Sequence, residues 1–161
     1  MSSLLLFINQ VAGWFLFAII LIIPGIIAAT FWTPFLVSER LRALFRKLPP
    51  TNSVFSSYII AGISASLPYI IGFLVILAVG DVDNTQVSNS LITMSLLLFM
   101  VYTIGLPFIG VILLPRIGVD WDPHNYSVST WILLAAGGAW YAILFTIPLA
   151  AFAFLLALPT G

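Results

Sequence analysis

Four long apolar runs, none of which contains a charged residue, dominate this sequence. They cover residues 11–37, 58–79, 91–114 and 131–158. A transmembrane helix needs about 20 consecutive apolar residues, so every run is long enough to cross a bilayer. The sequence therefore predicts an all-α integral membrane protein that folds as a bundle of four transmembrane helices.

The composition of the chain leaves little room for a soluble domain. Of the 161 residues, 62% are hydrophobic and only 6% are charged, whereas about a quarter of residues are charged in soluble proteins. The connections between the runs are short, so we predict a single membrane domain over residues 1–161. The net charge of zero argues against a basic surface, and we expect no nucleic-acid partner.

A proline lies inside each apolar run, at Pro24, Pro68, Pro107 and Pro148. Proline has no backbone N–H, so it leaves the carbonyl four residues earlier without its helical donor. In hydrocarbon no bulk water replaces that donor. We therefore predict that all four transmembrane helices are kinked.

Two of the carbonyls that lose a donor belong to residues with hydroxyl groups, Ser64 and Thr103. This leaves two interpretations of Ser64, Pro68, Thr103 and Pro107. They are either packing positions, where kinks and local hydrogen bonds let the helices form a compact bundle, or the lining of a polar pathway.

Small residues recur at four-residue intervals in the second and fourth runs. The pairs are Ala61 with Ala65, Gly62 with Ser66, Ala135 with Ala139, and Gly138 with Ala142. This spacing puts both members of a pair on one helix face, where helix backbones can approach closely. We expect close packing at these faces, within one chain or between chains.

Residues 38–48 form the clearest amphipathic pattern. Apolar residues recur at positions 37, 41, 44, 45 and 48, and the basic residues fall on the opposite side. The basic residues are Arg40, Arg42, Arg46 and Lys47. The pattern predicts an interfacial amphipathic helix. Its basic face is expected to bind anionic lipid headgroups or, alternatively, a protein partner.

The distribution of charge predicts an orientation. All five basic residues lie in the first and third connections, whereas the second connection contains only Asp81 and Asp83. The positive-inside rule then places the first connection, with its amphipathic helix, in the cytoplasm. With four spans, we expect a multi-pass protein of the cell membrane whose two termini both lie outside.

The connection after the third run contains Asp120, Asp122 and His124, which could supply ligands to a divalent ion. The segment lacks the glycine and the closing glutamate of an EF-hand loop. We therefore predict an interfacial loop without a metal, with Trp121, Tyr126 and Trp131 at the level of the headgroups. The role of Asp120, Asp122 and His124 stays open, and an enzyme that acts on lipid headgroups through them is the third-ranked function.

Missing residue types exclude several kinds of chemistry. Without cysteine the chain has no disulfide, thiolate nucleophile or iron–sulfur cluster. Its single histidine cannot supply both axial ligands of a haem. The runs contain no residue that is ionisable at neutral pH, which makes proton-coupled transport a poor fit. We expect neither an enzyme nor a cofactor.

These observations favour a non-catalytic role. We expect an accessory or assembly subunit that packs against membrane lipids and against other membrane subunits or copies of itself. The alternative is an oligomeric channel or facilitator for a small solute or ion, lined by hydroxyls and by the carbonyls that the prolines leave free.

Overall fold

The computed structural model describes residues 13, 16, 19, 22–49, 53–79, 84–122 and 126–158. The regular elements in this part of the chain are helices, with no strand among them. After a helical segment at residues 22–32, the elements are the 3₁₀ helix η1 (Thr33–Val37), α2 (Glu39–Lys47), α3 (Val54–Val79), α4 (Asn84–Phe108), the π-helix η2 (Ile109–Leu113), α5 (Leu114–Arg116) and α6 (Val128–Ala157).

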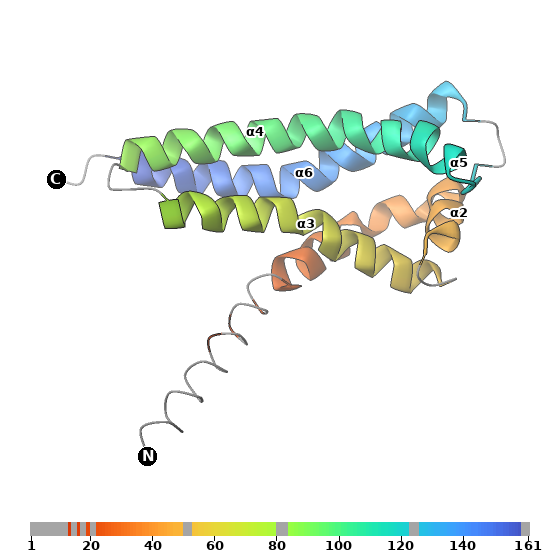
Figure 1. Ribbon diagram of the computed structural model, residues 1–161, viewed down its shortest axis with the longest axis horizontal. Helices are drawn as coiled ribbons and strands as arrows, with labels where there is room; N and C mark the ends of the chain where they lie inside the picture. Colours follow the sequence, from red (N-terminus) through yellow and green to blue (C-terminus); the bar gives the residue numbers. More distant parts are fainter. Residues whose placement is uncertain are drawn as a thin grey trace, which may run out of the picture.

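The long helices α3, α4 and α6 lie side by side, and α4 and α6 form the most extensive contact (Figure 1). In the described residues, three helices are long and apolar enough to cross a membrane: Val54–Ala78, Asn84–Arg116 and Val128–Ala157. An all-helical chain with helices of membrane-spanning length is therefore confirmed. The predicted first span is described only in part, as the shorter apolar helix Ile22–Val37, because most of residues 11–21 lie outside the described residues.

The helices begin earlier than the apolar runs. Helix α3 begins at Val54 instead of residue 58, α4 at Asn84 instead of residue 91, and α6 at Val128 instead of residue 131. The added first turns contain polar residues, which hydropathy excludes from a run but which continue the helix without difficulty. The apolar pattern thus marks only the apolar part of each helix and not its full length.

The prolines differ in their local effects. Helices α3 and α6 continue without interruption through Pro68 and Pro148. By contrast, α4 changes to the π-helix η2 directly after Pro107. The N-terminal segment changes to 3₁₀ geometry around Pro34. The prediction of one continuous α-helix over residues 11–37 is therefore wrong at its C-terminal end.

Tryptophan side chains satisfy carbonyls that prolines leave without donors. In the π-helix the N–H of Leu114 donates to the carbonyl of Ile109, five residues earlier. The next donor in this register would be residue 115, which is proline, so the carbonyl of Gly110 has no helical partner. The indole Nε1 of Trp121 donates to that carbonyl at 2.7 Å. Trp121 is accordingly buried against the protein, and its predicted level in the membrane stays a prediction.

A reciprocal pair of tryptophans joins the N-terminal segment to α6. Trp32 Nε1 donates to the carbonyl of Gly137 at 3.0 Å, and Trp140 Nε1 donates to the carbonyl of Phe31 at 3.1 Å. In a 3₁₀ helix the carbonyl of Phe31 would accept from the backbone N–H of residue 34, but that residue is proline and has none. The indole of Trp140 takes the place of this donor. These bonds fix the segment against α6.

Small residues bring the helices into close contact, as their spacing predicts. A Cβ atom added to Gly62 of α3 would lie 2.8 Å from Cβ of Ala29, and one added to Gly25 would lie 2.7 Å from Oγ of Ser66. On α6, an added Cβ at Gly138 would meet the backbone carbonyl oxygen of Tyr102 in α4. The predicted small-residue faces therefore pack within the chain at these positions.

Candidate functional site

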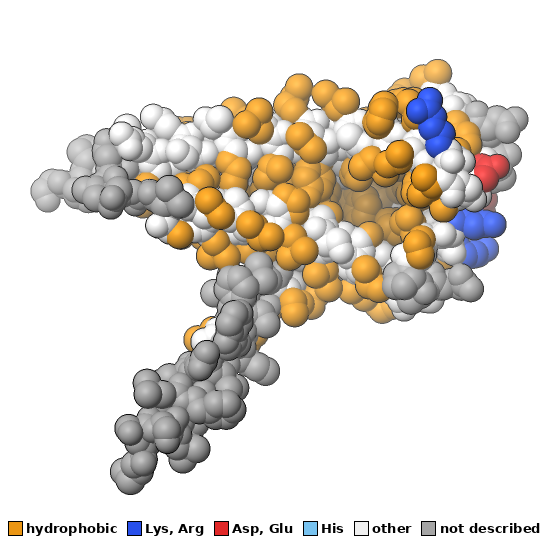
Figure 2. Space-filling view, viewed as in Figure 1, with side chains coloured by type: hydrophobic (Ala, Val, Ile, Leu, Met, Phe, Trp, Pro, Cys, Tyr) orange, Lys and Arg blue, Asp and Glu red, His pale blue; other side chains and the backbone are white. Residues whose placement is uncertain are grey.

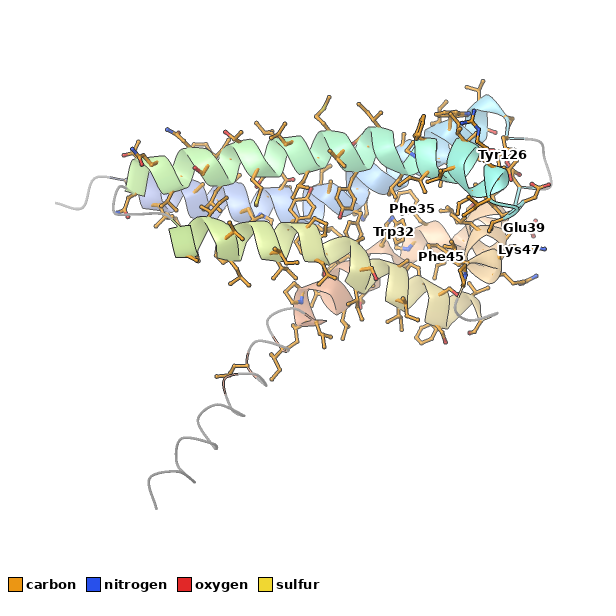
Figure 3. All side chains as sticks on the ribbon, in the orientation of Figure 1. Trp32, Phe35, Glu39, Phe45, Lys47 and Tyr126 are labelled. Carbon is orange, nitrogen blue, oxygen red and sulfur yellow. The ribbon has the colours of Figure 1, made fainter. Side chains whose placement is uncertain are left out.

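Among the described residues, charged side chains gather at one end of the bundle, where Arg40 of α2 reaches the start of α6 (Figures 1 and 2). Helix α2 buries its apolar face through Leu41, Leu44 and Phe45. The ring of Phe45 meets that of Trp32 edge to face, with centroids 5.6 Å apart. Figure 3 places Glu39 and Lys47 at the outer end of the bundle, beyond this aromatic contact.

Arg40 turns toward the protein instead of toward its surroundings. Its Nη1 donates to Oγ of Ser129 at 2.5 Å, to Oγ1 of Thr130 at 3.1 Å and to Oγ of Ser127 at 3.3 Å. The hydroxyl of Thr130 in turn donates to Oδ2 of Asp122 at 2.5 Å. Thr130 is fully buried and Asp122 is 5% exposed. We call Arg40, Asp122, Ser127, Ser129 and Thr130 the Arg40–Asp122 network.

The other three basic residues of α2 face outward. Arg42, Arg46 and Lys47 are exposed. Arg42 Nη2 lies 4.0 Å from Oε1 of Glu39, and both side chains are well exposed. Such surface pairs contribute at most about 1 kcal/mol. The structure therefore divides the four predicted basic residues into one that binds inside the protein and three that stay available at its surface.

The loop before α6 uses its polar groups locally. Tyr126 donates from its hydroxyl to Oδ1 of Asp120 at 2.5 Å. Burial raises the pKa of the Tyr126 phenol, and the hydrogen bond to Asp120 raises it further. No group of three metal-ligating side chains comes together within the part of the chain that the structure describes. His124 lies outside the described residues, so the absence of a metal stays a prediction.

The residues of the predicted pathway lie in different surroundings. On α3, Ser64 and Pro68 are exposed. On α4, Pro107 is buried and Thr103 is half-buried, with its hydroxyl donating to the carbonyl of Phe99 at 2.8 Å. This bond runs along α4 itself, as the packing interpretation expects. Pro68 also borders an open depression of about 590 Å³ on the α4 side, together with Thr93 and Asn89.

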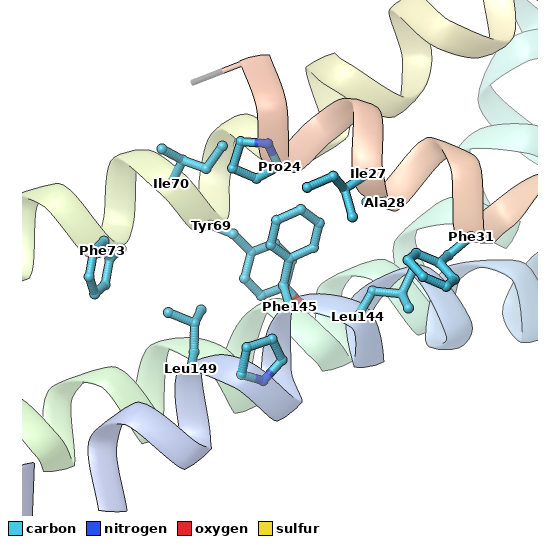
Figure 4. Close-up of a pocket in the computed structure, with 11 residues that line it drawn as sticks. Pro24, Ile27, Ala28, Phe31, Tyr69, Ile70, Phe73, Leu144, Phe145 and Leu149 are labelled. Atoms are coloured by element: carbon cyan, nitrogen blue, oxygen red, sulfur yellow. The ribbon is translucent and has the colours of Figure 1, made fainter. Parts of the chain in front are cut away.

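An apolar pocket of about 420 Å³ opens where residues 24–31, α3 and α6 meet (Figure 4). Aliphatic, proline and aromatic side chains line it. They are Pro24, Ile27, Ala28, Phe31, Tyr69, Ile70, Phe73, Leu144, Phe145, Pro148 and Leu149. The rings of Tyr69 and Phe145 stack within this lining, with centroids 4.9 Å apart.

Sequence reasoning missed this pocket. The available signal was the four-residue spacing of Tyr69 with Phe73 and of Phe145 with Leu149, which puts large side chains on one face of each helix. The same spacing is typical of ordinary packing faces. Only the meeting of three segments distinguishes a pocket from a packed core.

Comparison with known proteins adds a family but no described activity. No match to this chain was found among curated proteins or among solved structures. One family model covers residues 12–160, which is nearly the whole chain. The matched range includes both the Arg40–Asp122 network and the apolar pocket. The protein belongs to the family described as "Domain of unknown function (DUF8162)".

Proposed function

We propose that this protein is a non-catalytic accessory or assembly subunit of the cell membrane, which packs against other membrane proteins and lipids. One observation carries this proposal: aromatic hydroxyl and indole groups inside the bundle bind backbone carbonyls, whereas large apolar side chains face outward. The polar groups inside the bundle therefore stabilise the fold, and the outer apolar faces remain available to contact lipids or other membrane proteins.

The interior evidence comes from three tyrosines. Tyr58 donates to the carbonyl of Ala29, Tyr102 to that of Ala65, and Tyr141 to that of Gly62. All three bonds join different helical segments. Because these hydroxyls are engaged in structural bonds, they favour packing over solute conduction as the role of the bundle centre.

The exterior evidence is an apolar stripe along α4. Leu97, Val101, Ile104 and Phe108 are all exposed, and their spacing of four, three and four residues puts them on one helix face. We call these residues the α4 outer stripe. This is the spacing of a helix-packing seam, so the stripe is suited to a transmembrane helix of a partner.

The proposed topology has four spans, with α2 on the cytoplasmic side and both termini outside. The bonds from Arg40 to Ser127 and Ser129 support it, because they bring the first and third connections to the same end of the bundle. Those two connections contain all five basic residues. The exposed Arg42, Arg46 and Lys47 then contribute about 1 kcal/mol each to binding of anionic lipid.

Site-specific photo-cross-linking in native membranes tests the proposed role. A benzophenone amino acid at Ile104 should form a discrete adduct with another membrane protein. The same group at Phe154 of α6, which is similarly exposed, should give mainly lipid adducts. Equal labelling at both positions would contradict a specific partner surface on α4.

Purification and reconstitution of the protein distinguish a channel from an accessory subunit. Purification in mild detergent should retain a second protein chain. Three results together would favour a channel over a subunit. The protein would purify as a homo-oligomer without a partner, its liposomes would pass solute faster than protein-free liposomes, and Thr103→Val would abolish this flux.

A further inference from the structure

The apolar pocket lies where the protein meets the hydrocarbon of the bilayer in the proposed topology. It opens between the N-terminal segment and two helices of membrane-spanning length. We propose that this pocket binds one acyl chain of a bilayer phospholipid. The proposal goes beyond the accessory role and rests on the proposed topology only for the position of α2 at the membrane surface.

The chemistry of the lining selects a hydrocarbon ligand. Of the residues that line the pocket, Tyr69 alone carries a polar side-chain group, and none is charged. Burial of apolar area is worth about 25 cal/mol per Å², and this lining offers a ligand little other interaction. An apolar chain therefore fits the pocket, and a polar solute or ion does not.

The size of the pocket selects a chain over a helix. A buried apolar cavity of about 150 Å³ holds one benzene molecule, so about 420 Å³ holds an apolar group several times larger. One turn of an α-helix about 10 Å wide and 5.4 Å high fills roughly 400 Å³. A partner helix would thus enter for no more than about one turn, whereas a flexible chain can thread the full space.

The depth of the pocket points to the distal part of the chain. Residues 24–32 rise about 1.5 Å each and the five 3₁₀ residues about 2 Å each, so Pro24 lies up to roughly 22 Å from the start of α2. Phe31 lies roughly 12 Å away on the same count. Half of the hydrocarbon core is about 15 Å thick. With α2 at the headgroups, the pocket therefore lies near the bilayer centre.

Prolines shape two walls of the pocket. Pro24 lines it from the N-terminal segment (Figure 4). Pro148 lines it from α6. Each presents a rigid ring and lacks the N–H that would bond the turn before it. Leu144, whose carbonyl loses its donor to Pro148, also lines the pocket. Two of the four prolines that predict kinks, Pro24 and Pro148, thus lie at the pocket between the helices.

Photo-cross-linking with lipid probes tests the proposal. The full chain is reconstituted into phosphatidylcholine vesicles that contain a phospholipid with a diazirine near the end of one acyl chain. Adducts should concentrate on peptides with residues 69–73 and 144–149. A probe with its diazirine near the ester group should label these peptides several-fold less.

Substitution of Ile27 provides the decisive variant. Ile27 lines the pocket and is about half exposed, so Ile27→Trp fills the space without a clash in a closed core. It should lower pocket labelling several-fold. Ile132→Trp, at an exposed α6 position outside the pocket, is the matched control and should leave labelling unchanged. Leu149→Trp, on the opposite wall, provides a second variant if Ile27→Trp misfolds.

Three results would overturn the proposal. They are labelling spread evenly over the outer helix faces, labelling that both pocket variants leave intact, and preferential labelling by a polyisoprenoid probe. The Ile104 cross-link to a protein partner is measured in parallel. Loss of the partner adduct with retained lipid labelling would refute the accessory role alone, and the reverse pattern would refute the acyl-chain site alone.

Discussion

The charged end of the bundle and its apolar middle are held together in different ways. At the charged end, one arginine donates to three hydroxyls on or beside the first turn of α6. In the middle, helices touch through glycines, and aromatic side chains donate to backbone carbonyls. The first arrangement depends on hydrogen bonds between side chains, and the second depends on glycines that have no side chain and on aromatic donors to backbone carbonyls. The two regions should therefore fail under different substitutions.

The largest effect is expected in the middle, at Gly138. Gly138→Val would place side-chain atoms against the backbone of Tyr102, where the α4–α6 contact cannot relax easily. We expect a loss of about 3 kcal/mol, at the upper end of the usual cost of overpacking, seen as a lower midpoint of thermal unfolding in detergent. Gly105→Ala is the control, because its added Cβ meets only a Val101 methyl group at 3.9 Å. Equal midpoints for the two variants would show that close α4–α6 packing does not stabilise the bundle.

At the charged end, Arg40→Ala should be the most damaging change. It removes the guanidinium donor to the hydroxyl of buried Thr130, which itself donates to Asp122, at a cost of about 1–3 kcal/mol. Arg46→Ala removes the same charge from an exposed position of the same helix and should change stability by no more than about 0.5 kcal/mol. If both variants unfold at the same temperature, Arg40 acts only as a surface charge.

The junction between the two regions is tested at Trp121. Trp121→Phe keeps the aromatic ring but removes the donor to the Gly110 carbonyl, which costs about 1–2 kcal/mol for a buried group left unpaired. Trp131→Phe, at a partly exposed position, is the matched change. Thermal unfolding of both variants measures the difference. A smaller loss for Trp121→Phe than for Trp131→Phe would contradict the assigned role of this indole.

The smallest effect concerns the pH response of the loop. Because burial and then Asp120 raise the pKa of Tyr126, its neutral form is favoured in the folded protein. This contribution to stability is complete below the ordinary tyrosine pKa of about 10 and is lost as pH rises through the folded-state value. The absorbance of tyrosinate, taken as the difference from Tyr126→Phe, follows this titration. Asp120→Asn should lower the midpoint, and an unchanged midpoint would remove Asp120 as a cause.

Sequence reasoning reached the all-helical class and the long apolar helices because hydropathy is a local property. It also placed the amphipathic face of residues 38–48, whose Leu41, Leu44 and Phe45 are buried. The close contacts of Gly62 and Gly138 followed from small-residue spacing. These features need only a few neighbouring residues to be recognised.

The rest depended on contacts between distant parts of the chain. Nothing near Arg40 indicates that it faces inward, because its partners lie 87 to 90 residues later. The bond from Trp121 to the Gly110 carbonyl could not be predicted either, because that carbonyl lacks a helical donor only in the π-helical register. The pocket is formed where three segments meet without filling the space between them, and the sequence of any one segment does not indicate such a space.

The separation between Arg40 and its partners also orders the events of biosynthesis. Chains grow at about 5–20 residues per second, so roughly 5–20 seconds pass between synthesis of Arg40 and of Thr130. In the proposed topology, all four basic residues of the α2 segment are available throughout that interval as the orientation signal for insertion. Only when α6 emerges does one of the four leave the surface. If the proposed topology holds, a single arginine serves first in setting the topology of the nascent chain and afterwards in closing the finished bundle.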